Sequence, residues 1–553
     1  MGKKLMMAVA VILAVLLLAA CGGGNGGGSP GASGGGQGGG GGAAPQGQTL
    51  TIGHQQAITS LDSAFAYDFD TNPAVVQIME PLLNVDEKGN LTPCLASSWK
   101  EVDSTTYTYE IVQNAKFSDG KPMTIDDVLF SLQRYQDPKL ASYLAWMYGS
   151  VASIEKTGDW EITVKLAQPD AMWKFVPATT AGDIHEKAVV EKLGEAYGSV
   201  GNYPIGTGPY AVDNWVAGGD ITLKYNPDYW NAQGKTPQVT TVVFQNISED
   251  STRALATASG QIDINLSANV DLLDKIKEGG KADIMKLERW GGSYIALNCG
   301  KAPFNDVNAR RALASAIDIQ SIQSSVIKDY GNPPNGIMIP ESLYGADKDS
   351  WNSLVADVTK YPYDPAKAKE YLQMSAYPDG FSFVLTVDEN SVNNAVALAV
   401  QQQLAAVGIT MTLNKVSNDE ATSQQFGSGI VDGVRPYDAL TAGWLGDFPD
   451  AGGMLKPIIT SDQAGEGGSN FAAYSNPDVD KNMNDQNQET DPAKRLETLQ
   501  KAVKVVADET PYYVFCQTNW LFGVNKRLTN INDVLTANYT WFFPIKDLQV
   551  AAS

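Results

Sequence analysis

The chain has 553 residues, of which 43% are hydrophobic and 9% aromatic, enough to bury more than one core. Its net charge of -22 argues against nucleic acid as a partner, because phosphate binding needs clustered Lys and Arg. The same charge disfavours direct adsorption to anionic lipid. Only two histidines are present, His54 and His185, and they lie far apart, so we expect no histidine-based metal site.

The first residues have the pattern of a secretory signal. Lys3 and Lys4 precede an apolar segment, Leu5–Ala20, of roughly 15 residues, shorter than the ~20 needed to span a bilayer. The sequence Leu18-Ala-Ala-Cys21 resembles the lipobox of bacterial lipoproteins. The resemblance implies that residues 1–20 are removed and that Cys21 carries a lipid. The alternative is an ordinary cleaved signal with an incidental cysteine.

A glycine-rich segment follows Cys21. From Gly22 to Gln48 no apolar side chain is larger than Ala or Pro, so nothing offsets the entropy lost on ordering. We expect a disordered tether with a root-mean-square span of about 30 Å. The other cysteines, Cys94, Cys299 and Cys516, can form at most one disulfide, and the sequence does not identify the pair.

Short patterns predict the elements that follow the tether. Thr49–Gly53 alternates as a strand, and Ala74–Leu83 has apolar residues at helical spacing. Tyr107–Val112 is a second strand. Asp126–Arg134 is predicted to be a helix, with Thr124 as its N-cap and two acids in its first turn.

The second half of the chain contains a βαβ pattern. Asp364 can cap a helix that has Pro365 at its first position. Further on, the strand Phe381–Val387, a helix from about Asn393–Val407 and the strand Ile409–Leu413 follow one another. A strand, helix and strand at this spacing require a parallel pair, so at least one lobe is α/β.

A colinear series of motifs covers nearly the whole chain after the tether. It includes Leu95-Ala-Ser-Ser-Trp99, Lys116-Phe-Ser-Asp-Gly120, Pro204-Ile-Gly-Thr-Gly-Pro-Tyr210, Asn226-Pro-Asp-Tyr-Trp230 and Pro303-Phe-Asn-Asp-Val307. Together these motifs resemble the bacterial extracellular solute-binding proteins of family 5, which bind peptides, oligopeptides or nickel for ATP-driven importers. The resemblance implies an α/β, two-lobed periplasmic-binding-protein fold with an extra subdomain, the lobes being joined by hinge strands.

The same resemblance implies a division of the chain. It assigns residues 1–20 to the signal peptide and 21–48 to the lipidated cysteine and tether. Lobe I would comprise residues 49–80, 204–297 and 512–553, and the extra subdomain residues 81–203. Residues 298–511 would form lobe II.

The candidate ligand site is centred on one segment. A strand-like run, Tyr437–Ala442, leads into the glycine-broken loop Gly443–Asp450. From the residues alone, Trp444 fits core packing and Asp447 fits a turn. In the resembled family the pattern W-x-x-D-(Y/F)-x-(D/E)-P supplies the aspartate that binds a peptide's α-ammonium, so Trp444 would pack on the ligand and Asp447 would bind the amine. A carboxylate and an ammonium in a water-poor cleft form a strong charge-assisted hydrogen bond. Ala451 stands where the family has proline.

Other candidate residues remain open. Tyr294 is either a ligand contact or hinge packing, and Asn470 either donates to a peptide carbonyl or belongs to a turn. A peptide's carboxylate would need Lys or Arg, which no motif identifies. Arg435 is close to the Trp444 loop in sequence, but we expect it at the surface.

Enzyme motifs are not supported by their context. Gly31-Ala-Ser-Gly-Gly35 matches a nucleophile elbow but lies in the tether, and Gly206–Ala211 resembles a dinucleotide fingerprint without the helix that this motif requires. We therefore expect an exported binding protein and no enzyme, anchored as a lipoprotein to the outer face of the cytoplasmic membrane or periplasmic.

The expected ligand is a short peptide, and the expected partners are a membrane permease and its ATPase. We expect a monomer with no cofactor, metal or nucleic acid. The alternatives are the same fold binding a nickel complex, a sugar or haem, a secreted hydrolase, or a surface adhesin or sensory receptor.

Overall fold

The computed structural model describes residues 47–86, 89–344, 347–427, 429–431, 434–535 and 543–551. Cys21, the signal segment and nearly all of the predicted tether lie outside these ranges. Residues 47–553 form one compact unit. Within the described ranges, no helix combines the length and the apolar character needed to cross a bilayer.

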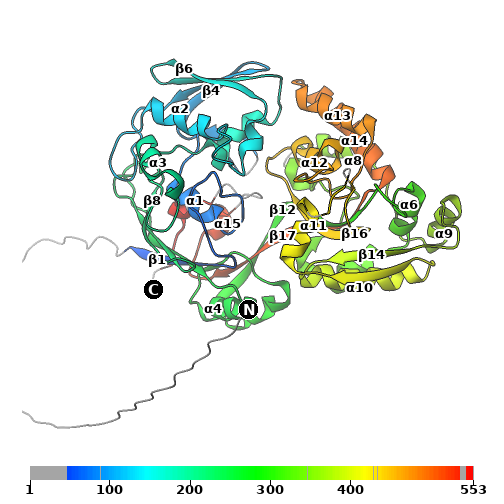
Figure 1. Cartoon of the computed structure of the whole chain (residues 1–553). Coiled ribbons are helices and arrows are strands. Elements are labelled where there is room, and N and C mark those ends of the chain that lie inside the picture. The colour runs from blue at the N-terminus through cyan, green and yellow to red at the C-terminus, as the bar shows by residue number, and fades with distance from the viewer. Residues whose placement is uncertain are drawn as a thin grey trace, which may run out of the picture. The chain divides into compact units, whose positions relative to one another are not determined.

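An 11-stranded sheet forms the centre of this unit, in the order β15-β14-β16-β12-β17-β11-β1-β10-β9-β8, with β13 paired to β17 outside this path. Its strands are β1 (Gln48–His54), β8 (Tyr210–Trp215), β9 (Ile221–Tyr225), β10 (Val239–Asn246), β11 (Ile264–Asn265), β12 (Ala282–Leu297), β13 (Gly331–Asn332), β14 (Ser382–Val387), β15 (Thr410–Lys415), β16 (Ala439–Leu445) and β17 (Tyr512–Asn525). The long strands β12 and β17 stand in the middle of this order. Each begins in one part of the sheet and continues into the other (Figure 1).

We call the two parts of this sheet the first and second half-sheets. The first half-sheet contains β1 and β8–β11 with residues 282–288 and 519–525 of the two long strands. The second half-sheet contains β14–β16 with residues 291–297 and 512–517. Only β12 and β17 are shared by the two half-sheets, so the chain passes between the half-sheets through these two strands. Any motion of one half-sheet relative to the other would therefore bend them.

The pairing of β12 with β17 is interrupted between the half-sheets. Glu288 pairs with Asn519 and Gly292 pairs with Gln517, so three residues of β12 face a single residue of β17, Thr518. A bulge of this kind bends a strand and redirects its side chains. It places Arg289 and Trp290 at the junction of the half-sheets.

A separate four-stranded sheet has the order β4-β5-β7-β6, and its strands are β4 (Ala96–Asp103), β5 (Thr106–Ile111), β6 (Val151–Gly158) and β7 (Glu161–Leu166). We call this sheet and its helices, residues 96–193, the four-stranded unit. A two-stranded ribbon of β2 (Leu83–Val85) and β3 (Leu91–Pro93) precedes it. The four-stranded unit has a core of its own, which contains Trp173, Tyr109 and Phe117. This core is distinct from the core under the first half-sheet.

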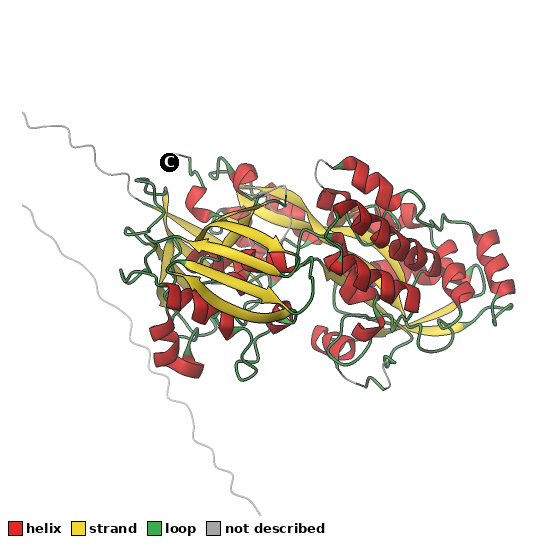
Figure 2. Ribbon diagram, turned by 90° about the horizontal axis from the view of Figure 1, so that it is seen from above, coloured by secondary structure: helices red, strands yellow, loops and turns green. Residues whose placement is uncertain are grey.

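The α-helices other than α2 and α3, which belong to the four-stranded unit, cover the two half-sheets, and Figure 2 shows many of them gathered on the side of the second half-sheet. They are α1 (Asn72–Ile78), α2 (Ile125–Arg134), α3 (Lys187–Leu193), α4 (Asp250–Ser259), α5 (Leu273–Glu278), α6 (Val307–Ser315), α7 (Ile319–Ile322), α8 (Lys348–Val355), α9 (Pro365–Met374), α10 (Ser391–Ala405), α11 (Asn418–Phe426), α12 (Ala451–Ile459), α13 (Pro477–Gln488), α14 (Pro492–Glu509) and α15 (Ile531–Val534). Two apolar cores pack on the second half-sheet.

The predicted helix caps are confirmed. Thr124 accepts a hydrogen bond from the Asp127 amide and Asp127 reciprocates, which completes a capping box at α2. Asp364 accepts from two amides of α9, whose first residue is Pro365. The predicted βαβ unit is also confirmed, because β14 and β15 are parallel with α10 between them.

The helix predicted over Ala74–Leu83 is shorter than expected. It ends at Ile78, and Met79 is extended. Pro81 disfavours helical geometry for the residue before it. That residue, Glu80, instead accepts hydrogen bonds from the hydroxyl of Tyr229 at 2.6 Å and the indole of Trp230 at 2.7 Å.

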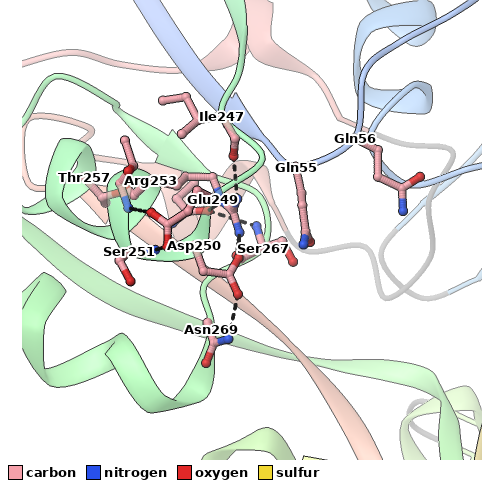
Figure 3. A network of polar contacts seen from close by, with 12 residues as sticks. Gln55, Gln56, Ile247, Glu249, Asp250, Ser251, Arg253, Thr257, Ser267 and Asn269 are labelled. Carbon is pink, nitrogen blue, oxygen red and sulfur yellow. Dashed lines mark hydrogen bonds and ion pairs between the residues drawn. The ribbon is translucent and has the colours of Figure 1, made fainter. Parts of the chain in front are cut away.

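A buried arginine connects α4 to the first half-sheet (Figure 3). Arg253 is 1% exposed and donates to the carbonyls of Ile247 and Ser267 at 2.6 and 2.9 Å. Its guanidinium also pairs with Asp250, which in turn accepts from Asn269 at 2.7 Å. These bonds satisfy a charge that would otherwise be costly to bury.

Candidate functional site

A cavity of about 340 Å³ lies where the two half-sheets meet. Its lining comes from the loop before α1, the bulge of β12, the end of α11, the end of β16 and β17. The lining residues are Tyr67, Asp68, Phe69, Asn72, Trp290, Gln425, Phe426, Gly443, Trp444, Leu445, Gly446, Asp447, Phe471 and Trp520. Cavities of about 350 and 280 Å³ lie elsewhere, but neither contains Trp444 or Asp447. The cavity at the junction is therefore the candidate site.

Strand β16 positions Trp444. The strand begins at Ala439 and continues to Leu445, so Trp444 lies in the sheet and not in the loop that we expected to begin at Gly443. Its register partner on β12 is Gly292. The indole donates to the carbonyl of Met454 at 2.8 Å, which holds the partly buried ring against α12 at the edge of the cavity.

Two glycines of β12 permit this close pairing. A Cβ on Gly291 would overlap the carbonyl oxygen of Trp444, and one on Gly292 would lie 2.8 Å from the carbonyl oxygen of Cys516. Both obstacles are backbone atoms, which cannot rotate away. Gly291 therefore lets β16 approach β12 at the bulge, and Gly292 does the same for β17 on the other side of β12.

Asp447 lies in the short loop between β16 and α12 and faces the loop before α1. The hydroxyl of Tyr67 donates to its Oδ1 at 2.8 Å. Loss of solvent around the carboxylate raises the pKa of Asp447 to about 6, although the hydrogen bond from Tyr67 lowers it. Loss of solvent around its hydroxyl and the neighbouring carboxylate raise the pKa of the Tyr67 phenol well above its usual value. A carboxylate held in this way is a strong acceptor for a cationic donor.

The second acid of the predicted loop has a different environment. Asp450 accepts from the amide of Gly453 at 2.8 Å as the N-cap of α12 and forms an ion pair with Arg495. Burial alone would raise the pKa of Asp450, but the charge and hydrogen bonds of Arg495 outweigh burial and lower it. Ala451 is the first residue of α12, a position where proline is common but not required.

Phe448 was not singled out by the sequence. It follows Asp447 directly, is 2% exposed, and belongs to the core of the four-stranded unit. Its ring lies 6.0 Å from that of Trp146 and 6.2 Å from that of Phe175, centroid to centroid. The loop that carries Asp447 is therefore inserted into a core formed by another part of the chain.

Two residues named from the sequence do not line this cavity. Tyr294 is 0% exposed and packs edge-on against Tyr512 in a core of the second half-sheet, with a centroid separation of 4.9 Å. Asn470 is fully buried, and its amide donates to the carbonyls of Thr460 and Tyr474 at 2.9 and 2.8 Å.

The expectation that Arg435 lies at the surface is wrong. Its side chain is 1% exposed and donates to the carbonyls of Gln425, Gly468 and Asn470. These acceptors come from the end of α11 and from the loop around Gly468, which are separated in sequence, so no local pattern indicated them.

The three cysteines within the described ranges are free thiols, and burial raises the pKa of each. In the same ranges no group of three or more His, Cys, Asp or Glu side chains is arranged to hold a metal ion. Cys21 lies outside the described residues, so its predicted lipidation has no structural counterpart here.

Known proteins resemble the chain over most of its length. It is 28% identical over 496 residues to the probable D,D-dipeptide-binding periplasmic protein DdpA of Escherichia coli strain K12, covering 88% of this chain and 92% of that protein. It is 26% identical over 474 residues to the glutathione-binding protein GsiB of the same strain, covering 85% and 89%.

Solved structures share the fold. The oligopeptide-binding protein AppA of Bacillus subtilis, in complex with a nonapeptide, has a TM-score of 0.74 at 24% identity and covers 92% of this chain and 99% of its own. The binding protein CtaP of Listeria monocytogenes has a TM-score of 0.80 at 22% identity, covering 92% and 100%. These similarities confirm the predicted α/β periplasmic-binding-protein fold with an extra sheet subdomain.

A family model also matches more than half of the chain. The model for "Bacterial extracellular solute-binding proteins, family 5 Middle" matches residues 90–466. Proteins of this kind bind a solute outside the cytoplasm for an ABC importer and catalyse no reaction. The chain therefore belongs to the bacterial extracellular solute-binding proteins of family 5, as a substrate-binding protein of an ABC importer.

Proposed function

We propose that this protein is a lipid-anchored receptor that captures short peptides in the cavity around Asp447 and delivers them to a membrane permease. The observation that carries the proposal is the Asp447 carboxylate at an aromatic cavity between the two half-sheets, with its pKa raised to about 6. Three similar proteins have named ligands that are peptides, a D,D-dipeptide, glutathione and a nonapeptide, and these support a peptide as the ligand here.

Each proposed contact has a physical reason. Asp447 would bind the α-ammonium, because a carboxylate with little solvent gains most from a cationic donor. Trp444 would pack on the peptide backbone at the edge of the cavity. The hydroxyl of Tyr67, which donates to Asp447 in this structure, would give up that bond to the incoming amine.

The buried environments of Tyr294 and Asn470 favour the packing and turn roles that were left open for them. We therefore base the site on Trp444 and Asp447.

We retain as a proposal the division into lobe I (residues 49–80, 204–297 and 512–553), the subdomain (81–203) and lobe II (298–511). Support comes from the separate cores of the four-stranded unit and the two half-sheets. Ligand would stabilise the form in which the lobes are closed.

The substitution Asp447→Asn tests the site. The amide keeps the shape of the side chain but removes the charge that pairs with an ammonium. We expect it to weaken binding of peptides with free amino termini by at least tenfold and to leave binding of N-acetylated peptides unchanged, as measured by calorimetry on the purified full-length protein.

Asp379→Asn is the matched control, since Asp379 is an exposed acid in a turn that does not line the cavity. Equal losses for free and acetylated peptides would remove Asp447 from amine binding.

A tight peptide at 100 times its dissociation constant should also raise the free energy of unfolding by about 2.7 kcal/mol. If no peptide from two to five residues raises the unfolding temperature, the peptide assignment is wrong.

The proposed anchor has an independent test. Cys21→Ser removes the thiol that a lipid would modify. We expect the native chain to partition with membranes and to carry a diacylglyceryl mass at its mature N-terminus, and the variant to be recovered without lipid. A native chain that begins after an ordinary signal cleavage and carries no lipid would overturn the anchor.

A further inference from the structure

The walls of the cavity around Asp447 are unusually rich in aromatic side chains. Seven of the fourteen lining residues are Phe, Tyr or Trp. Tyr67 and Phe426 are 39% and 37% exposed, although large apolar side chains of this type are usually covered. Aromatic faces attract both apolar groups and cations. The cavity is therefore suited to a ligand with an apolar or cationic body.

The charges in the same lining have one sign. Asp68 and Asp447 are acidic, and none of the fourteen lining residues is Lys, Arg or His. The Oδ1 atom of Asn72, a buried side chain in the same wall, has no hydrogen-bond partner among the described residues. Among the described residues, the cavity lining thus offers acceptors and negative charge to a ligand but no cationic partner for a carboxylate.

Two arginines outside the lining contact aromatic rings that form the cavity walls. The guanidinium carbon of Arg289 is 3.6 Å from the ring centroid of Trp520, whose ring also stacks on Phe69 at 3.5 Å. The guanidinium carbon of Arg435 is 5.6 Å from the ring centroid of Phe471, and its Nη atoms donate to backbone carbonyls. Neither arginine is part of the lining.

From these observations we infer that the cavity selects its ligand by an amine and an apolar or aromatic group and binds no carboxylate. This inference rests on the proposed peptide-binding function and specifies its substrate class. The ligand is an amine whose carboxyl group is neutralised, as in an amide, or the amino-terminal end of a longer peptide whose carboxylate lies outside the cavity. A free dipeptide would bring its carboxylate close to two acids, which disfavours it.

Three matched ligands test the inference on the purified full-length protein: phenylalanyl-alanine amide, the same dipeptide as the free acid, and the N-acetylated amide. We expect the amide to bind at least tenfold more tightly than the free acid, and the acetylated amide to lose most of its affinity. Free acid bound as tightly as the amide, or more tightly, overturns the inference and leaves peptide binding intact. If neither the amide nor the free acid binds, the inference is overturned, and the peptide assignment is decided separately by the peptides of two to five residues.

A variant of Arg289 separates the inference from its main competitor. Arg289 has a buried Nε without a hydrogen-bond partner in the described part of the chain, so it could turn to meet a carboxylate. We expect Arg289→Met to leave the ratio of the amide and free-acid affinities unchanged. Selective loss of free-acid binding would assign carboxylate recognition to Arg289 and overturn the inference.

The aromatic walls are tested with Phe426→Ala. We expect this substitution to weaken phenylalanyl-alanine amide at least fivefold more than alanyl-alanine amide, because the lost ring faces the ligand side chain. Leu398→Ala is the control, since Leu398 is an exposed apolar residue on α10 outside the cavity. Equal effects of Phe426→Ala on both amides would overturn the aromatic preference.

Discussion

At the scale of single residues, Asp447 is the group whose ionisation should control binding. Its pKa is raised to about 6, mainly by loss of solvent. A raised carboxyl pKa means that the ligand-free protein takes up a proton at Asp447 as the pH falls through 6, and the neutral acid cannot pair with an ammonium. The hydrogen bond from Tyr67 opposes this shift but does not cancel it.

We therefore expect amine ligands to bind with constant affinity between pH 6.5 and 7.5 and to weaken about tenfold per unit below pH 6. The α-ammonium stays protonated through most of this range, so the change belongs to the protein. Calorimetry from pH 5 to 7.5 measures it. The Asp447→Asn variant should give a flat profile, and a native profile without a break near pH 6 would contradict the role of this carboxylate.

At the scale of elements, the junction of β12 and β16 depends on glycine. Gly291 lies at the bulge of β12, and a Cβ there would overlap a backbone oxygen of β16. Because both strands are held by ladder hydrogen bonds, neither can move away without loss of pairing. The glycine is thus required by close approach of two strands and not by a turn.

Gly291→Ala should lower the free energy of unfolding by about 1–3 kcal/mol, the usual cost of forcing extra atoms into a packed site. Denaturant titration measures the change. The matched control is Gly465→Ala, because a Cβ at Gly465 has no atom within 4 Å. If both variants are equally stable, β12 and β16 are not as closely packed as described.

At the scale of the whole molecule, Phe448 connects the binding loop with the four-stranded unit. The residue is covered by rings of that unit, although it follows β16 of the second half-sheet. Opening of the lobes would expose it to water, at a cost of about 1.5–3 kcal/mol for a side chain of this size. We therefore expect Phe448 to favour the closed form of the proposed lobes even without ligand.

Phe448→Ala should shift the ligand-free protein toward the open form, with a larger radius of gyration in small-angle scattering and at least tenfold weaker ligand binding. Tyr143→Ala is the control, since Tyr143 is an exposed aromatic residue of the four-stranded unit. Saturating ligand should restore the native radius of gyration. An unchanged radius and unchanged affinity would show that Phe448 packs without contributing to closure.

Much of the fold could be predicted because it depends on neighbouring residues. The capping box of Thr124 and Asp127, the N-cap Asp364 with Pro365, and the βαβ alternation are local patterns within a few turns of chain. The motif series likewise indicated the family and the segment that contains Trp444 and Asp447. For these features the responsible hydrogen bonds and side-chain periods are contained in the segment itself.

The sequence by itself therefore determined the family, the local elements and the segment that contains Asp447, the residue proposed to bind the amine. Only the tertiary structure decided what surrounds that segment: Tyr67 donates to Asp447 across 380 residues, Arg495 pairs with Asp450, and Arg435 is buried. The reason is that burial and charge pairing are set by atoms that folding brings together from distant parts of the chain. Local hydrogen bonds specify a helix or a strand, but they carry no information on which distant side chain will cover it.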